Sequence, residues 1–313
     1  MREKSEILDW EGRRLVPAGL ATLAGVALVI ASAFAIGSVS GDGEAELLRS
    51  AYENSSSVTL ASILQAGGFV LLVAPLVVLF RAAAARSDRM RYQLIGLVVA
   101  APLFLAASAV LNAVATNDAA NEFVAGKAES GITIRAAGED CQSELKDLGA
   151  KEFGEEFGGS QGVGLKECTT TKIADEAASN AVSEAPTRGI ATGFGLGGRL
   201  GLAIALFYSC LYGMRTGLLT RFWGSLGMAL GVAALLLLVQ FTMIWFIYFA
   251  LLLLGRLPGG RPPAWAAGEA IPWPTPGERA AASLDPSDPA GPSDPPTEDP
   301  SDQGERRKRK QRD

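Results

Sequence analysis

Residues 222–254 read FWGSLGMALGVAALLLLVQFTMIWFIYFALLLL, a run of 33 residues without a charged side chain. A single helix of this length would measure about 50 Å at 1.5 Å per residue, whereas the hydrocarbon core of a bilayer is about 30 Å thick. We therefore expect two helices that turn around residues 238–240. The first would start near Leu218, with Arg221 extending to the interface, and the second would end at Leu254. One long span is the alternative.

Four other segments have the length and apolar character of membrane helices, about 20 residues each. They are residues 15–36, 60–80, 94–114 and 196–214. The first could also be a secretory signal peptide, but its apolar region is long and no small-residue cleavage site follows a short core, which favours a retained anchor. The predicted fold class is all-α, a polytopic bundle of six transmembrane helices, or five if residues 222–254 cross once. The composition agrees, since 49% of residues are hydrophobic and only 19% are charged.

The charges in the connections indicate the orientation. Residues 81–91 contain four arginines and one aspartate, whereas residues 42–53 contain one arginine and four acidic residues. Lys and Arg collect in short cytoplasmic loops, so the 81–91 connection is expected inside and the 42–53 connection outside. It follows that the amino terminus is cytoplasmic and the long connection after the third span is external. An even number of spans also places the basic cluster at 306–312 in the cytoplasm, which favours six.

The chain therefore divides into five regions. They are a cytoplasmic amino terminus (1–14), spans one to three (15–115), an external acidic segment (116–192), spans four to six (193–255) and a cytoplasmic tail (256–313). The tail is rich in Pro, Gly, Ser, Asp and Glu and cannot bury enough apolar surface to fold alone, so we expect it to be disordered. Its terminal basic cluster either lies on the anionic inner leaflet or serves only to fix the orientation.

The external segment contains Cys141 and Cys168, two of the three cysteines in the chain. An external location permits a disulfide, and closing a loop of about 28 residues would stabilise this segment by roughly 3 kcal/mol. Two free thiols are the alternative. A metal site is disfavoured because the chain has no CxxC motif and no histidine. Cys210 falls in the middle of a span and is expected to be a small buried hydrophobe.

The fourth span is rich in glycine. Gly193, Gly195 and Gly198 fit the GxGxxG pattern of dinucleotide sites, but no strand precedes them and no acidic residue follows at the required distance. A packing repeat explains the region better, because a small residue recurs at every fourth position and leaves a groove for another helix. The repeat comprises Gly193, Gly197, Gly201, Ala205, Ser209, Gly213 and Gly217. A helix of this chain is the favoured partner, and self-association through the fourth span is the alternative. The next helix offers a matching face at Gly224, Gly227 and Gly231.

The residue inventory disfavours most chemistry. Without histidine the chain lacks the commonest general base and metal ligand. The acidic pairs at 139–140 and 155–156 lie among glycines and are expected to be solvated. The main polar side chains inside the spans are Gln65, Asn112 and Gln240, and Arg199 lies close enough to the outer interface to extend into it. We expect no ionisable residue deeper in the membrane, no cofactor, no bound metal and no nucleic-acid partner.

Two function classes follow. The favoured hypothesis is a non-enzymatic component of the membrane or envelope, whose partners are the lipid bilayer and another membrane protein. The alternative is a small-solute permease or channel, in which the three amides would contact the solute.

Two motifs support a resemblance. Residues 215–224 read RTGLLTRFWG, and residues 262–274 read PPAWAAGEAIPWP. On these motifs the membrane portion and the proximal tail resemble a group of uncharacterised multi-pass membrane proteins of high-GC actinobacteria. The resemblance implies a bacterial cytoplasmic membrane and carries no activity. The external segment is longer than the corresponding connection in that group.

Overall fold

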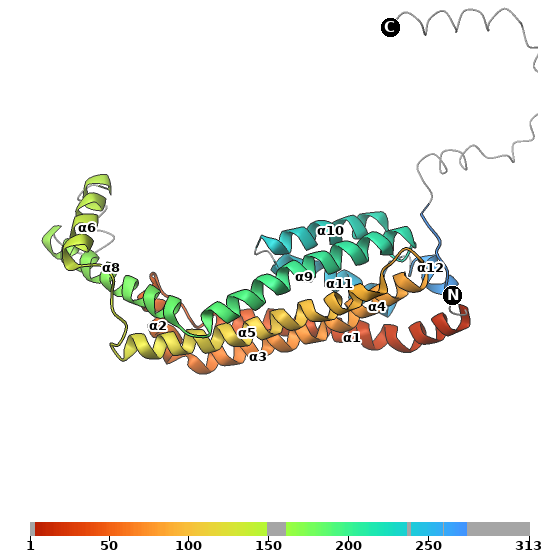
Figure 1. Ribbon diagram of the computed structural model, residues 1–313, viewed down its shortest axis with the longest axis horizontal. Coiled ribbons are helices and arrows are strands. Elements are labelled where there is room, and N and C mark those ends of the chain that lie inside the picture. Colours follow the sequence, from red (N-terminus) through yellow and green to blue (C-terminus); the bar gives the residue numbers. More distant parts are fainter. Residues whose placement is uncertain (1–3, 149–160, 237–238, 259, 274–313) are drawn as a thin grey trace, which may run out of the picture. The chain divides into compact units, whose positions relative to one another are not determined.

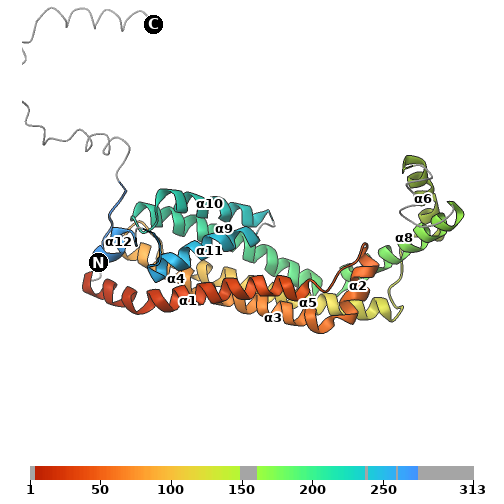
Figure 2. The ribbon, with the colours of Figure 1, turned by 180° about the vertical axis from the view of Figure 1, so that it is seen from behind.

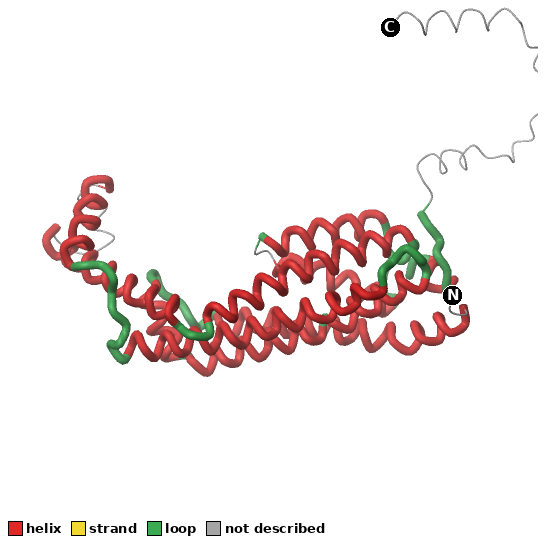
Figure 3. The backbone as a smooth tube through the Cα atoms, in the orientation of Figure 1, coloured by secondary structure: helices red, strands yellow, loops and turns green. Residues whose placement is uncertain are grey.

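The computed structural model describes residues 4–148, 161–236, 239–258 and 260–273, and every regular element in them is a helix (Figure 3). The acidic pair at 155–156 and the tail from residue 274, including the basic cluster, lie outside the described residues. Four helical runs are long and apolar enough to cross a membrane, which indicates a membrane protein. They are Lys4–Ile36, Ser55–Ala85, Tyr92–Val124 and Arg188–Arg215.

The first three runs form one side of the bundle (Figure 1). They consist of α1 (Lys4–Ile36), α3 (Ser55–Leu71) continued by α4 (Val73–Ala85), and a short 3-10 turn, η1 (Tyr92–Leu94), continued by α5 (Ile95–Val124). The helix breaks between α3 and α4 at Leu72, just before Pro75, whose ring clashes with the preceding turn and which has no N–H to donate. We call the end of the bundle at Lys4 and Ala85 the clasp end, and the end at Ile36 and Ser55 the α2 end.

Residues 222–254 form the two helices expected from their length. α10 (Arg221–Leu235) and α11 (Val239–Leu254) pack against each other, and α10 also packs against α9 (Arg188–Arg215). The Nε1 of Trp245 in α11 donates to the carbonyl of Trp223 in α10 at 3.0 Å. The Trp223 ring stacks on Tyr248, with ring centroids 3.7 Å apart. With 15 and 16 residues these helices are shorter than the other four runs.

Small residues allow α9 to approach α5 closely. A Cβ atom at Gly201 would lie 2.8 Å from the Cβ of Ala101, and one at Gly198 would lie 2.9 Å from the backbone nitrogen of Leu105. Both distances are too short for an ordinary contact, so this approach requires glycine. α5, a helix of the same chain, thus occupies this part of the glycine-rich surface of α9.

The four-residue repeat is only partly used in this packing. Gly197 faces the Phe104 ring, Ala205 and Ser209 are buried, and Gly213 lies against Leu219. Gly193 has no atom near its Cβ position, and Gly217 lies beyond the end of α9 with a φ of +77°. The matching face on α10 lies close to α9, with Gly231 near the carbonyl of Ala203 and Gly224 against Met214.

The external segment expected from the sequence is largely helical. It contains the end of α5, α6 (Ile134–Leu148) and α8 (Gln161–Glu184), and these lie with α2 (Glu44–Glu53) at the α2 end (Figures 1 and 2). An alanine-rich cluster joins α2, α3, α5 and α8. It consists of Ala45, Leu48, Ala51, Val58, Ala113, Ala119, Ala120, Ala178 and Ala181. The pair Glu139 and Asp140 is exposed on α6.

The tail also differs from the expectation. Residues 256–273 do not extend away from the bundle, because α12 (Pro263–Ala267) packs into its clasp end. Ala264 and Trp265 are buried there. A tryptophan has enough apolar surface to hold a short segment against a bundle, although the segment's overall composition is polar.

Candidate functional site

A cavity of about 250 Å³ lies toward the α2 end, between α1, α3, α5, α9 and α11. Its polar lining includes every amide that the sequence singled out inside the spans. The polar side chains are Ser62, Gln65, Ser108, Asn112, Thr116, Arg199 and Gln240. We call this space the amide cavity. Four different helices contribute these side chains, so the site exists only in the folded bundle.

The base of the amide cavity is apolar. Val29, Phe69, Leu105 and Met243 line it at the positions nearest the clasp end, given the direction in which each helix runs. All four residues are buried. The cavity therefore has polar groups above a closed apolar floor.

Four polar side chains of the cavity are engaged within the protein. The hydroxyls of Ser62 and Thr116 donate to the carbonyls of Thr59 and Asn112, each at 2.8 Å. The Nδ2 of Asn112 donates to the Ser108 hydroxyl at 3.2 Å, and that hydroxyl donates to the carbonyl of Ala191 at 2.9 Å. An Nη of Arg188 donates to the Oδ1 of Asn112 at 3.1 Å. Asn112 thus ties α5 to the first turns of α9, which is a structural role.

Three polar side chains of the cavity, those of Gln65, Arg199 and Gln240, make no hydrogen bond within the described residues. Arg199 is partly buried, its Nε is buried without a partner, and none of the cavity's lining residues is acidic. The sequence predicts that Arg199 lies close enough to the outer interface to extend into it, and in the structure this residue also lines the cavity. The cavity therefore has an uncompensated positive charge and unused donors.

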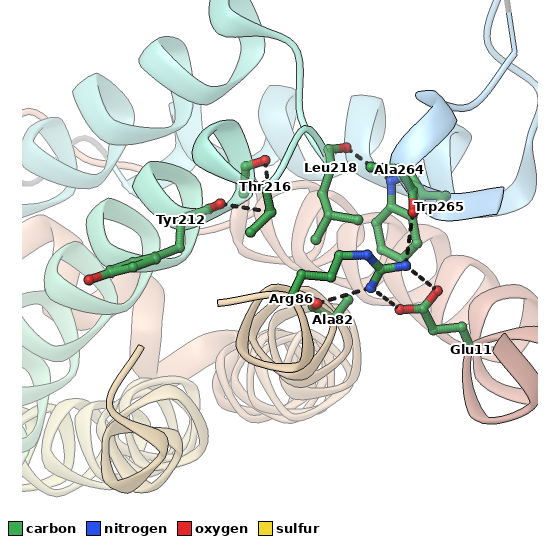
Figure 4. A network of polar contacts seen from close by, with 9 residues as sticks. Glu11, Ala82, Arg86, Tyr212, Thr216, Leu218, Ala264 and Trp265 are labelled. Carbon is green, nitrogen blue, oxygen red and sulfur yellow. Dashed lines mark hydrogen bonds and ion pairs between the residues drawn. The ribbon is translucent and has the colours of Figure 1, made fainter. Parts of the chain in front are cut away.

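A second polar cluster lies at the clasp end and centres on a buried ion pair (Figure 4). Both Nη atoms of Arg86 donate to the carboxylate of Glu11, one of them at 2.9 Å to Oε2. The guanidinium also donates to the carbonyls of Ala82 and Ala264, each at 3.0 Å, and lies over the Trp265 ring. We call this cluster, together with the segment 260–273, the clasp.

The clasp brings together the two motifs on which the resemblance rests. The Nε1 of Trp265 donates to the carbonyl of Leu218 at 2.9 Å, and the Nε1 of Trp273 donates to that of Leu219 at 2.8 Å. The backbone N–H of Ile271 donates to the carbonyl of Thr216 at 3.1 Å. The first motif and residues 262–273 of the second are therefore contacting parts of one structural unit.

Sequence reasoning missed the clasp because it assigned Glu11 and Arg86 to solvated cytoplasmic segments. The sequence does contain one indication of the clasp. Trp265 and Trp273 lie in a Pro-rich segment, whereas disordered segments contain few aromatic residues. Two further glycines were also missed. Gly25 and Gly68 allow α1 and α3 to meet, because a Cβ at Gly68 would lie 2.7 Å from the carbonyl oxygen of Gly25.

The cysteines lie as the sequence suggested. Cys141 in α6 and Cys168 in α8 form a disulfide with Cα atoms 6.1 Å apart. An ion pair between Glu144 and Lys172, at 2.9 Å, joins the same two helices. Cys210 is a free thiol and fully buried in α9.

The chain matches no known family model, no curated protein and no solved structure. In the part of the chain that the structure describes, no group of His, Cys, Asp or Glu is arranged to hold a metal ion. The function is therefore inferred from the geometry of the cavity, the clasp and the helices at the α2 end.

Proposed function

We propose that this chain is a non-enzymatic interaction or envelope-associated component of a bacterial cytoplasmic membrane, related to the uncharacterised actinobacterial group that it resembles. Its α2 end faces outward and both termini are cytoplasmic. In this arrangement the helices α2, α6 and α8 form a water-exposed layer that contacts a partner protein. We call them the outer helices.

The observation that carries this proposal is the firm attachment of the outer helices to the bundle. The N-terminus of α2 has no side-chain cap of its own, and the carboxylate of Asp175 in α8 accepts a hydrogen bond from the Ala45 N–H at 2.9 Å. The alanine-rich cluster fixes α8 against α2 and α5, and the disulfide fixes α6 to α8. A surface held in a fixed geometry binds a partner at a lower entropic cost than a loose connection would.

Six spans follow if both α10 and α11 cross the membrane. At 1.5 Å per residue they measure about 22 to 24 Å, less than a hydrocarbon core of about 30 Å. Flanking residues and local thinning of the bilayer complete such a crossing at modest cost. The orientation rests on the arginines of the connection at 81–91.

Topology is tested by single cysteines in a background that lacks the native ones. A cysteine at Ser283 is expected to resist a membrane-impermeant reagent in intact cells and to react after lysis. A cysteine at Ile134, which is 76% exposed on α6, is the positive control and is expected to react in intact cells. Labelling of position 283 from outside would contradict the six-span orientation.

The interaction is tested by a photo-crosslinking residue at Ile134 in living cells. We expect a discrete protein adduct, which mass spectrometry then identifies as a different protein or a second copy. The matched control is Leu196, which is 60% exposed on α9 and is expected to face lipid. If position 134 gives no protein adduct, or gives the same products as position 196, the outer helices are not an interaction surface.

A small-solute permease remains the second candidate, and the amide cavity favours it because Gln65, Asn112 and Gln240 line one space. Against it, the clasp half of the bundle is filled by large buried side chains such as Phe80, Trp245 and Phe249. Solute flux in liposomes that is lost on changing the three amides would favour the permease. Absence of flux together with a crosslinked partner would favour the interaction component.

A further inference from the structure

We propose that the amide cavity binds a phosphate-type oxyanion, with Arg199 as its counter-charge. This site is separate from the outer helices, so it does not depend on the interaction proposed above. A phosphate group reaches the cavity either as the headgroup of an anionic lipid or as free inorganic phosphate. The chemistry of recognition is the same for both.

The positive charge of Arg199 favours an anionic ligand. An arginine inside a membrane protein is costly unless it is paired or hydrated, and such residues usually mark a functional site. Within the described residues Arg199 has neither an ion pair nor a hydrogen bond, and its Nε is buried. A guanidinium binds a phosphate through parallel N–H donors, which compensates the charge and satisfies several donors at once.

The surrounding groups suit an anion. The amides of Gln65 and Gln240 are free to donate, and no acidic side chain lines the cavity to repel it. Asn112 is held by Ser108 and Arg188, so the wall beside the anion is already fixed. Arg199, Gln65 and Gln240 are therefore the groups left to contact the anion.

The size and position of the cavity favour a headgroup over a larger molecule. Its volume of about 250 Å³ lies just below the range of roughly 300 to 1,000 Å³ that is usual for drug-sized ligands. Arg199 is the fourth residue of the apolar run 196–214, and its long side chain can extend toward the interface at the α2 end, where lipid phosphates are concentrated. The apolar floor of the cavity closes it on the side of the clasp end. It consists of Val29, Phe69, Leu105 and Met243.

Binding is measured on the full chain in maltoside micelles, which contain neither phosphate nor charge. Three probes are compared: a short-chain phosphatidylglycerol, a diacylglycerol with the same chains, and inorganic phosphate. Native mass spectrometry reports the bound probe, and thermal unfolding reports stabilisation. We expect the phosphatidylglycerol to stay bound and to raise the unfolding midpoint, and the diacylglycerol to do neither. An equal effect of inorganic phosphate would support the site and identify the free anion as its source.

The role of Arg199 is tested by Arg199→Gln, which is expected to weaken binding of the phosphate probe at least tenfold. Without the probe this variant should be as stable as the parent or more so, since it removes an uncompensated charge. Arg135→Gln is the matched control and should bind normally, because Arg135 is 89% exposed on α6. If Arg199→Gln does not fold, Gln65→Leu tests the same cavity, with an expected loss of about fivefold for one hydrogen bond.

Three results would overturn the proposal. The first is that neither phosphatidylglycerol nor inorganic phosphate binds the parent chain. The second is that the diacylglycerol binds as well as the phosphatidylglycerol. The third is that Arg199→Gln, or Gln65→Leu where that variant replaces it, binds the phosphate probe as tightly as the Arg135→Gln control.

Discussion

Replacing Glu11 by glutamine should destabilise the protein by about 3 kcal/mol. The side chains of Glu11 and Arg86 are 2% and 0% exposed, so the substitution leaves a buried guanidinium without its counter-charge. Breaking a buried pair in this way typically costs about 3 to 5 kcal/mol. Glutamine keeps one acceptor oxygen for Arg86, which places the expected cost at the lower end. For a chain of this size the midpoint of thermal unfolding should fall by roughly 6 to 12 °C.

The assay uses Cys210 as the reporter of unfolding. It is fully buried, and the other two cysteines of the chain are joined in a disulfide. A thiol-reactive fluorophore therefore reports the exposure of α9 during heating. The matched control is Glu269→Gln, since Glu269 also pairs with a cation near the clasp but its pair with Lys4 is 56% and 62% exposed. Exposed pairs contribute about 0 to 1 kcal/mol, so this variant should melt close to the parent.

If Glu11→Gln and Glu269→Gln lower the unfolding midpoint by the same small amount, burial does not determine how much the Glu11–Arg86 ion pair contributes to stability. A second variant separates charge from packing. Replacing Glu11 by leucine and Arg86 by methionine together removes both charges at similar volume, so the double variant should melt above Glu11→Leu alone. A double variant that melts below that single one would show that the bonds from Arg86 to the carbonyls of Ala82 and Ala264 matter more than the charge pair.

Three further outcomes follow from the packing. The substitution Gly68→Ala should destabilise the bundle by about 1 to 3 kcal/mol, because the added Cβ would lie 2.7 Å from a backbone oxygen of α1. The control Gly67→Ala should be neutral or slightly stabilising in the same melting assay, because no atom lies nearer than 3.7 Å to the added Cβ. Replacing Cys141 and Cys168 together by serine should cost the outer helices roughly 3 kcal/mol, measured as faster proteolysis of α6 and α8 with little change in the midpoint reported by Cys210. Trp265→Phe should cost about 1 kcal/mol in that midpoint by removing its indole N–H, and an unchanged midpoint would show that this bond does not hold the clasp.

The sequence predicted the helical architecture well, for reasons of length and polarity. A charge-free run of 33 residues is too long for one span, and the structure divides it between Leu235 and Val239, close to the turn expected at 238–240. The proximity of Cys141 and Cys168 was also predicted, because two cysteines in one external segment are natural partners. Both inferences depend on local composition, which a sequence shows directly.

The clasp was not predictable in the same way. Whether Glu11 and Arg86 are solvated or paired depends on the meeting of α1 and α4 with α12, and these elements are far apart in the chain. The tail was expected to be disordered because its average composition is polar. One buried tryptophan, Trp265, is enough to reverse that expectation for residues 256–273, since averages over a long segment hide a single anchoring side chain.

The glycine-rich helix shows a different limit. A repeat of four residues drifts around a helix of 3.6 residues per turn, so one straight neighbour cannot follow it. The contact with α5 instead uses Gly195, Gly198 and Gly201, which are three residues apart. For the amides, the sequence predicted the positions but not their proximity. Gln65, Asn112 and Gln240 were correctly identified as polar positions inside the spans, but only the packing of α3, α5 and α11 places them in one cavity.

Arg86, which is buried, and Arg199, which is partly buried, differ in the partners that the described part of the chain offers them. The Nη atoms of Arg86 find a carboxylate and two carbonyls within the chain, although its Nε, like that of Arg199, is buried without a partner among the described residues. Arg199 has the same chemistry and finds no such partner among the described residues. A cation without a partner is costly inside a membrane protein, so Arg199 leaves room for a compensating group that the described residues do not supply. The free amides of Gln65 and Gln240 beside it suit an anion, and the comparison of phosphatidylglycerol with inorganic phosphate decides whether an anion binds there.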